Sequence, residues 1–490
     1  MAIPFKEIPA ELLVPGQYQE IDNSLAGTTS DVKRALMIGT MSASGTATAG
    51  KAVQVRSADK AKILFGNGSP AAVMACEFLN HNKTEELWVL PIAENASGTK
   101  WNRSFGITAS NAQDGSVTIA VNGTELSATV SAGAAASDVA SAITAAINGA
   151  DNCPVEAEAV TNEETSAVSV KLTSVVKGVT GNYNTIEFIS AASGVKITAS
   201  EAVLGTLPPD IETPLKNLGA KRYHYMAADF TDAKNLKSLA NELKDRYTAL
   251  RQNDGRCFIG LSGELGDAST DGTMISAVQS INSPHIILVP RGETPQHPAF
   301  WAAAWCAILS RRFADDPAAN TTDTEIDDLV GEEYSPDDRE AMLSNGICTY
   351  RVDSSGTVLV ERVVTSYTEN SDGARDTSYL DMQTVETVSA IRTKINQEAR
   401  KKYKDWKLAH TNENFGAGSK VMTAAVWRSF LVELYQSYFI QEVQWCQDLE
   451  TYKKSIIVEV KKGSKTRLEY IHRPVLIGQF YVGAGLNQFQ

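Results

Sequence analysis

Residues 285–312 read HIILVPRGETPQHPAFWAAAWCAILSRR, and this stretch decides the fold class. The short apolar run at 285–290 predicts a strand, and the segment 298–312 that follows it predicts a helix. A strand that leads into a helix is the repeating unit of α/β proteins, in which helices cover a parallel sheet. The stretch therefore predicts one βα unit of such a sheet.

The same unit occurs repeatedly on the N-terminal side of this stretch. We expect strands at residues 35–39, 87–92, 223–229 and 257–261, and helices at residues 70–80, 233–250 and 273–281. In the helix 233–250, apolar residues recur at helical spacing on one face: Leu236, Leu239, Leu243, Tyr247 and Leu250. The pattern predicts a Rossmann-type parallel sheet that is interrupted between residues 98 and 206.

The interrupting stretch, residues 99–205, is rich in Ala, Ser, Thr, Val and Gly. Alternating or β-branched runs between turn signals predict strands at residues 116–121, 125–130, 167–172 and 185–190. One helix is expected at residues 137–148, with Ser137 as its N-cap. We interpret this stretch as a β-rich domain inserted into a loop of the α/β domain.

The C-terminal third combines helices with hairpins. Hairpins are expected at 348–364 and 455–472, a helix begins near Thr384, and a second helix carries an apolar stripe from Trp427 to Phe439. Residues 315–340 are strongly acidic and are expected to form a solvated loop, with a calcium site as a weaker alternative. This region predicts a separate α+β unit.

Length and composition narrow the class of protein. The chain has 490 residues, which at roughly 100–200 residues per domain indicates about three domains. Its net charge of −13 argues against binding nucleic acid, and no apolar run approaches the length of a membrane span. The first 20 residues lack the features of a signal peptide, so the protein is expected to stay in the cytosol of its producer.

Segments that resemble catalytic or ligand-binding motifs lack residues that those motifs require. GTATAGK at 45–51 resembles a phosphate-binding loop, but Ala52 stands where the loop needs a hydroxyl for Mg²⁺. Ser262 misses the nucleophile elbow because Glu264 replaces the closing glycine. The six cysteines are scattered and are expected to be buried free thiols. We therefore predict no catalytic residue, no cofactor and no metal.

Both ends of the chain carry apolar, strand-like sequence without an expected partner in their own domains. Such an end either docks on its own sheet or adds a strand to a neighbouring subunit. We predict strand exchange between subunits through these residues: Ile8, Leu12, Val14, Val475, Ile477, Phe480 and Tyr481.

One segment, residues 392–407, is basic, although the net charge of the chain is negative. It is either a solvated helical face or a docking surface for an acidic protein partner. The candidate contact residues are Lys394, Arg400, Lys401, Lys404 and Lys407.

Sequence features over nearly the whole chain resemble one family. They include the following: Ile8-Pro9, Val14-Pro15-Gly16, Phe65-Gly66-Asn67-Gly68-Ser69, Leu87-Trp88 with Pro91, Tyr379-Leu380-Asp381, Thr384, Arg392, Lys407-Leu408-Ala409 and Phe415-Gly416. With these features the chain resembles the tail sheath proteins of contractile-tailed bacteriophages, most closely the Mu-like sheath.

The resemblance implies a structural protein, not an enzyme. Its copies would stack as six-subunit rings around the tail tube and contract to drive the tube through the host envelope. Implied partners are further copies of the chain, the tail tube protein, and the baseplate and tail terminator proteins, with no nucleic acid and no membrane insertion. The implied location is the phage tail of the virion, assembled in the host cytoplasm. Two alternatives are the sheath of a headless phage-tail-like bacteriocin or injection system and, more remotely, a subtilisin-like or other α/β hydrolase.

The resemblance also sets the expected domain roles. A discontinuous α/β domain with a subtilisin-like fold would comprise residues 31–98 and 206–370, with the β-rich domain 99–205 projecting outward. An α+β domain, residues 371–473, would face the tube. Residues 1–30 and 474–490 would be extended linker arms.

Overall fold

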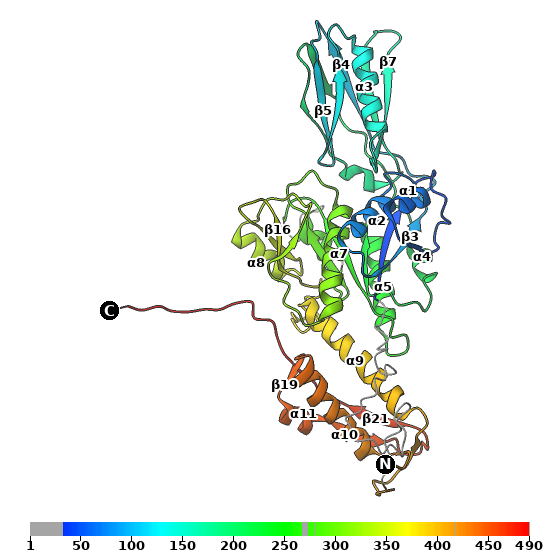
Figure 1. The fold of residues 1–490 in the computed structure, drawn as a ribbon, viewed down its shortest axis with the longest axis vertical. Coiled ribbons are helices and arrows are strands. Elements are labelled where there is room, and N and C mark those ends of the chain that lie inside the picture. Colours follow the sequence, from blue (N-terminus) through cyan, green and yellow to red (C-terminus); the bar gives the residue numbers. More distant parts are fainter. Residues whose placement is uncertain (1–32, 267–272, 280, 417, 490) are drawn as a thin grey trace, which may run out of the picture.

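The computed structural model describes residues 33–266, 273–279, 281–416 and 418–489. The N-terminal arm with Ile8, Leu12 and Val14 lies outside the described residues. Figure 1 shows three parts along the long axis: a β-rich part at the top, an α/β part in the middle and a mainly helical C-terminal part at the bottom. The predicted mixed α/β fold is confirmed.

The middle part is built on a six-stranded sheet in the order β13-β12-β11-β1-β3-β2. Five strands are parallel and β2 is antiparallel at one edge. Their bounds are β1 (Arg34–Thr40), β2 (Val53–Val55), β3 (Glu86–Ile92), β11 (Tyr225–Ala228), β12 (Arg256–Leu261) and β13 (Ile286–Pro290). The strands at the centre are buried on both faces, which is why they read as short, continuous apolar runs.

Helices cover both faces of this sheet. α1 (Ala58–Phe65), α2 (Pro70–His81) and α7 (Pro298–Asp315) pack on the face that carries Ala35 and Met37. α4 (Glu212–Lys216), α5 (Ala233–Tyr247) and α6 (Met274–Gln279) cover the face that carries Leu36 and Ile38. The predicted extent of α5 is wrong at its end. The helix stops at Tyr247, and Leu250 is 97% exposed instead of lying on the buried face.

The upper part contains two antiparallel sheets with an apolar core of their own. One has the order β10-β4-β8-β7 and the other β6-β5-β9, and helix α3 packs against strands of both. The bounds are β4 (Asn102–Ala109), β5 (Gly115–Val121), β6 (Thr124–Val130), α3 (Ala136–Asn148), β7 (Val155–Thr161), β8 (Val168–Ser174), the short helix η2 (Val179–Tyr183), β9 (Ile186–Ser190) and β10 (Val195–Ala199).

The predicted N-cap of α3 is wrong. Ser137 lies inside the helix, and the backbone N–H of Ala135, the residue before the first turn, donates to Asp138 Oδ2 at 3.0 Å. A carboxylate in the first turn also interacts favourably with the helix dipole, so Asp138 stabilises the start that Ser137 was expected to cap.

The acidic stretch 315–340 is more ordered than a solvated loop. It contributes β14 (Thr324–Ile326), which pairs with β16 (Val358–Arg362), and the start of α8 (Pro336–Ser344). Ile326 is fully buried and anchors the stretch on the core. β15 (Thr349–Val352) completes this sheet and forms the predicted hairpin with β16.

The lower part is organised around the long helix α9 (Met382–Tyr403) and α10 (Ala424–Leu434), which continues as a π-helical segment, η3 (Tyr435–Glu442). The remaining elements are short: β17 (Lys407–Leu408), β18 (Val421–Met422), β19 (Cys446–Gln447), α11 (Leu449–Ser455), β20 (Ile457–Val460), β21 (Leu468–Ile471) and β22 (Val475–Leu476). The predicted apolar stripe is confirmed as packing, since Phe430, Leu434 and Phe439 form a separate core with Ile391 and Ile395 of α9.

All six cysteines are free, as predicted, and four of them are buried; the predicted burial is wrong for Cys76 and Cys153, which are only partly buried. None of the helices in the described residues combines the length and apolar character that crossing a bilayer requires.

Candidate assembly surfaces

The first residues of the C-terminal segment pair with a strand of their own chain. Val475 and Leu476 form β22, which pairs with β19. The Val475 N–H donates to the Tyr435 hydroxyl at 3.0 Å, and that hydroxyl donates to Gln447 O at 2.7 Å. The Ile477 N–H donates to Trp445 O at 3.0 Å. The expectation that this segment lacks a partner in its own domain is therefore wrong for Val475 and Ile477.

The next residues cross from the lower to the middle part. The Gln479 side-chain amide donates to Ala318 O at 3.0 Å. The Tyr481 ring is half-buried and lies 4.6 Å from the guanidinium of Arg362, which pairs with Asp381 at 2.9 Å. Burial raises the pKa of Tyr481, so its phenol stays protonated at neutral pH. The predicted exchange residue Tyr481 is thus seated on its own subunit.

Beyond this point the segment leaves the body of the protein. Figure 1 shows it extending away from the lower part. The predicted exchange residue Phe480, just before this point, is 81% exposed, and the apolar side chains beyond it are largely in solvent as well: Val482 is 80% exposed, Leu486 83% and Phe489 99%. Burying such side chains is worth roughly 1.5–3 kcal/mol each, so a run of them indicates a surface that another molecule covers.

The basic segment divides into two groups. Arg392 pairs with Asp254 at 2.6 Å, and Lys394 pairs with Glu398 at 3.1 Å and lies 4.0 Å from the Tyr438 ring. These two side chains therefore hold the fold together. Lys394 is not available as the free contact residue that the sequence predicted.

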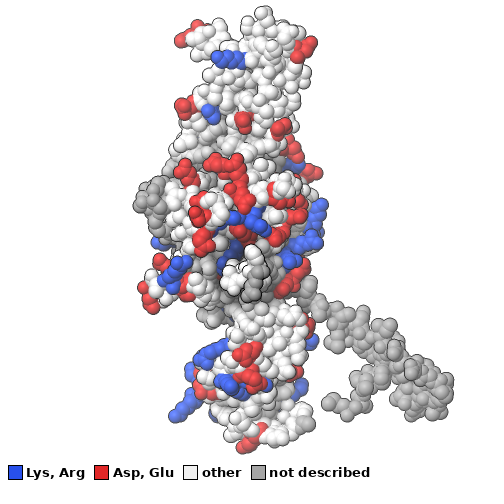
Figure 2. All heavy atoms as spheres, turned by 90° about the vertical axis from the view of Figure 1, so that its left-hand side faces the viewer, with Lys and Arg blue, Asp and Glu red and all other residues white. Residues whose placement is uncertain are grey.

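The second group lies at the end of α9 and just beyond it. Arg400, Lys401, Lys404 and Lys407 are exposed. Positive charges at a helix C-terminus also interact favourably with the helix dipole. Figure 2 shows Lys and Arg side chains on the lower part of the molecule, below a middle part rich in Asp and Glu. We define these four residues as the basic tip.

A buried ionic cluster joins α9 to the amino-terminal ends of the sheet strands. Asp254 is 2% exposed and is surrounded by Arg392 at 2.6 Å, Arg222 at 3.4 Å and Arg256 at 3.7 Å. Ser389 of α9 also donates to Asp254. Burial opposes the charge of Asp254, but these arginines hold its pKa well below its usual range. The sequence analysis missed this cluster, whose members are spread over residues 222–392.

Glu386 and His285 border the cluster. Glu386 pairs with Arg256 Nε at 3.1 Å. Burial, reinforced by Arg256, lowers the pKa of His285 to about 3, so the imidazole is neutral in the folded protein. A charged group that loses a partner here would be left buried and unpaired, which is strongly destabilising. The cluster therefore ties α9 to the sheet.

The inserted part rests on the carboxyl-terminal end of the parallel sheet. His297, in the loop after β13, lies 3.0 Å through Nε2 from Thr180 O, and Thr185 Oγ1 donates to Pro295 O at 2.6 Å. Tyr183 contacts Thr231, in the loop after β11, at 3.0 Å between hydroxyls. α/β proteins commonly bind ligands at this end of the sheet. Here the inserted part occupies it.

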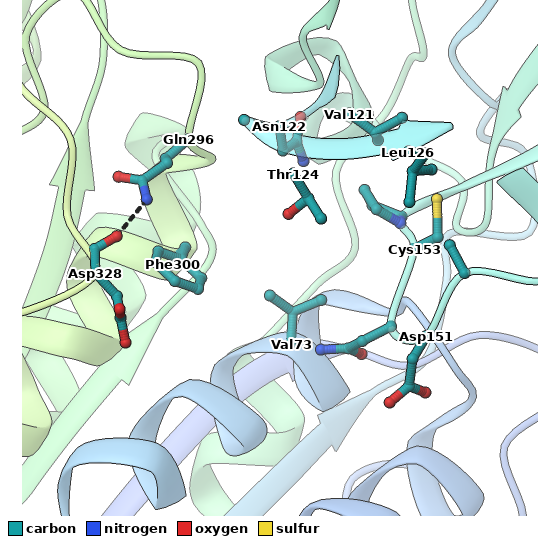
Figure 3. A pocket seen from close by; sticks show the side chains of 14 residues that line it. Val73, Val121, Asn122, Thr124, Leu126, Asp151, Cys153, Gln296, Phe300 and Asp328 are labelled. Atoms are coloured by element: carbon teal, nitrogen blue, oxygen red, sulfur yellow. Dashed lines mark hydrogen bonds between the residues drawn. The ribbon is translucent and has the colours of Figure 1, made fainter. Parts of the chain in front are cut away.

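A cleft of about 330 Å³ remains between the inserted part and the helices α2 and α7 of the middle part. Figure 3 shows Val73 and Phe300 on one side and Val121, Thr124 and Leu126 on the other, with Gln296 donating to Asp328 O. The lining is mixed apolar and amide in character, with Asp151 and Asp328 at the side. Among the described residues, no cluster of His, Cys, Asp or Glu could hold a metal ion.

Comparison with known proteins extends over the whole chain. A family described as phage tail sheath protein central domain matches residues 206–366. The Mu-like prophage FluMu tail sheath protein of Haemophilus influenzae is 31% identical over 499 residues, covering 100% of both chains.

Solved structures of low identity are also similar. The crystal structure of the sheath tail protein from Desulfitobacterium hafniense is 12% identical with a TM-score of 0.46, covering 94% of this chain and 100% of that one. The helical sheath of the anti-feeding prophage in its contracted state is 11% identical with a TM-score of 0.42, covering 97% of this chain and 99% of that one.

The match to this relative covers the full length of both chains. Both matches are to phage tail sheath proteins, which are structural components of the tail. The chain belongs to the phage tail sheath family and is a structural subunit of a phage tail.

Proposed function

We propose that this chain polymerises as six-subunit rings around a tail tube and contracts to drive the tube through the host envelope. The proposal rests on the 31% sequence identity to a tail sheath protein over the whole chain. The structure supports it through the exposed apolar C-terminal segment, which a single copy leaves in water. Polymer formation between identical copies would cover that surface.

We also propose a role for each part of the chain. We assign residues 1–30 and 474–490 as linker arms, residues 31–98 and 206–370 as a subtilisin-like central domain, residues 99–205 as an outward-projecting domain, and residues 371–473 as the tube-facing domain. The inserted part and the lower part lie at opposite ends of the long axis, which supports outward and inward roles for them (Figure 1).

The partners in this proposal are further copies of the chain, the tail tube protein, the baseplate and the tail terminator. The basic tip supports the tube contact because it is the exposed basic group at the end of α9. The proposal includes assembly in the host cytoplasm and excludes direct contact with nucleic acid, which the net charge of −13 disfavours.

The test is polymerisation of the purified full-length chain. Sedimentation and negative-stain electron microscopy over a range of protein concentrations should show long tubes or stacked rings with six-fold end views. Addition of the tube protein should raise the yield and order of these tubes. A chain that stays monomeric at every concentration, with and without tube protein, contradicts the proposal.

A further inference from the structure

We infer that the end of α1 and the loop after it form a latch that holds the inserted part at one fixed angle to the middle part. Asn67 and Gly68 belong to the motif at residues 65–69, and the latch gives that motif a role. The latch acts within one copy of the chain, so the inference does not depend on polymerisation. Its members are Lys62, Asn67 and Gly68 of the middle part and Asp151, Asn152 and Cys153 of the inserted part.

Two asparagine side chains make reciprocal hydrogen bonds across the latch. The Asn152 backbone N–H donates to Asn67 Oδ1 at 2.9 Å, and the Gly68 backbone N–H donates to Asn152 Oδ1 at 3.3 Å. Each asparagine thus satisfies a backbone donor of the other part. Because hydrogen bonds depend on both distance and direction, the pair fixes the separation and the relative orientation of the two loops.

An ion pair lies beside these hydrogen bonds. Lys62 Nζ is 2.6 Å from Asp151 Oδ2 and 3.0 Å from Asp59 Oδ1, so Asp59 helps to hold the ammonium group in place. Asp151 is exposed, and exposed ion pairs are weak and screened by salt. The hydrogen bonds and the backbone contact at Gly68 therefore contribute most of the latch.

Gly68 lets the two backbones approach more closely than another residue would allow. A Cβ at this position would lie 1.7 Å from Cys153 O, whereas contacts of this kind stay above 3.0 Å. Gly68 also has φ +73°, a backbone conformation that favours glycine. A side chain at position 68 would force the loops apart by about 1.3 Å or more, and the reciprocal hydrogen bonds would break at that separation.

The latch lies at one border of the cleft of about 330 Å³, and a second contact lies beside the other border. Figure 3 shows Asp151 and Cys153 on one side of the cleft and Gln296 on the opposite side. Next to Gln296, Pro295 O accepts a hydrogen bond from Thr185 Oγ1 at 2.6 Å. Supports on both sides of a gap prevent tilting across it. Loss of the latch would leave the angle of the inserted part supported from one side of the cleft.

Hydrogen exchange of the unassembled full-length chain tests the latch, with Gly68→Ala as the variant. Peptides that cover 66–69 and 150–154 should exchange at least tenfold faster in this variant. Strands β1 and β5, which carry buried residues of the middle and inserted parts, should keep their protection.

Gly133→Ala is the matched control for this experiment. Gly133 has φ +76°, and no atom of the described residues, apart from its chain neighbours, lies within 4 Å of the Cβ that it would gain. Both variants therefore carry similar backbone strain, but only Gly68→Ala forces the two loops apart. Equal exchange at 66–69 and 150–154 in the two variants overturns the inference.

A second variant tests the hydrogen bonds without adding a side chain at position 68. Asn67→Ala with Asn152→Gly removes both acceptor oxygens, and glycine readily adopts the φ of +55° found at position 152. The same peptides should again exchange at least tenfold faster. Full protection at 150–154 in this double variant overturns the inference, also in the case that Gly68→Ala does not fold.

In tubes, the latch should decide how uniformly the inserted part is oriented. Cryo-EM images of Gly68→Ala tubes should show blurred density for residues 99–205 around a well-ordered inner layer, whereas Gly133→Ala tubes should show both layers clearly. Sharp density for 99–205 in Gly68→Ala tubes overturns the inference and leaves the proposed function standing. If the unsubstituted chain forms no tubes, the proposed function alone fails, because the exchange experiment uses unassembled protein.

Discussion

Two buried titratable side chains, Asp254 and His285, lie where α9 meets the amino-terminal ends of the sheet strands. The pKa of Asp254 is held below its ordinary value of 3.8, and the pKa of His285 is lowered from 6.5 to about 3. Between pH 6.5 and about 3 the unfolded chain therefore binds a proton at His285 that the folded chain does not. His285 then contributes stability that is complete above pH 6.5 and is lost as the pH falls towards 3.

We predict that the free energy of unfolding decreases between pH 6.5 and pH 4 by up to about 1.4 kcal/mol per pH unit because of His285. Denaturant unfolding at several pH values measures this slope. His285→Gln removes the titration, so the variant should show a shallower slope over the same interval. Identical slopes for the two proteins would show that His285 is not held neutral by this cluster.

Along helix α9, some basic side chains have partners within the fold, and those near the C-terminal end are free to contact another protein. Arg392 and Lys394 have acidic or aromatic partners within the chain, whereas the basic tip is exposed. Exposed ion pairs contribute about 0.2–1 kcal/mol each and weaken with salt. Only their repetition along a polymer makes such contacts strong.

We predict that replacing Arg400, Lys401 and Lys404 with Gln weakens co-assembly with the tube protein and leaves the unfolding midpoint unchanged. Cosedimentation with preformed tubes over a range of salt measures the effect, which should be largest at low salt. The matched control replaces three exposed lysines of the middle part, Lys83, Lys237 and Lys244, with Gln. Equal binding by both triple variants would argue against a tube contact at the basic tip.

At the scale of the whole molecule, the inserted part is separable because its two ends meet and its core is its own. Thr99 and Thr206 form a bridge, with their hydroxyl oxygens 2.9 Å apart. The apolar core of the inserted part shares no residue with the two cores that flank the parallel sheet. Loops of the inserted part make polar contacts with the middle part through Thr180, Tyr183 and Thr185.

We predict that deleting residues 100–205 and joining Thr99 to Thr206 through two glycines gives a folded protein that still forms tubes of smaller outer diameter. The unfolding midpoint should fall modestly, because Val73 and Phe300 lose the partners that form the other side of the cleft. Circular dichroism and negative-stain images measure the two effects. A variant that is folded but unable to polymerise would place an essential subunit contact in the inserted part.

Elements with a local signal could be predicted from the amino-acid sequence. The strands at 285–290 and 257–261, the helices that cover them and the C-terminal hairpins were predictable because burial on both faces, helical periodicity and turn residues are written into neighbouring positions. β4, β7 and β10 were missed because polar or small residues interrupt their apolar runs; β7 and β10 lie at the two edges of their sheet, and β4 lies inside it.

Only the tertiary structure decided which charges and which ends have partners. Asp254 and Arg392 are 138 positions apart, and Tyr435 and Val475 are 40 apart. Basic residues along α9 look alike in sequence, yet Arg392 pairs with the buried Asp254 and Lys394 with Glu398, whereas Arg400 and Lys401 are exposed. Likewise, Val475 and Val482 look alike in sequence, but only Val475 lies beside β19. Hydrogen bonds and ion pairs depend on distances in space. Folding brings together residues that are far apart in the sequence, and nothing in their local sequence identifies the partner.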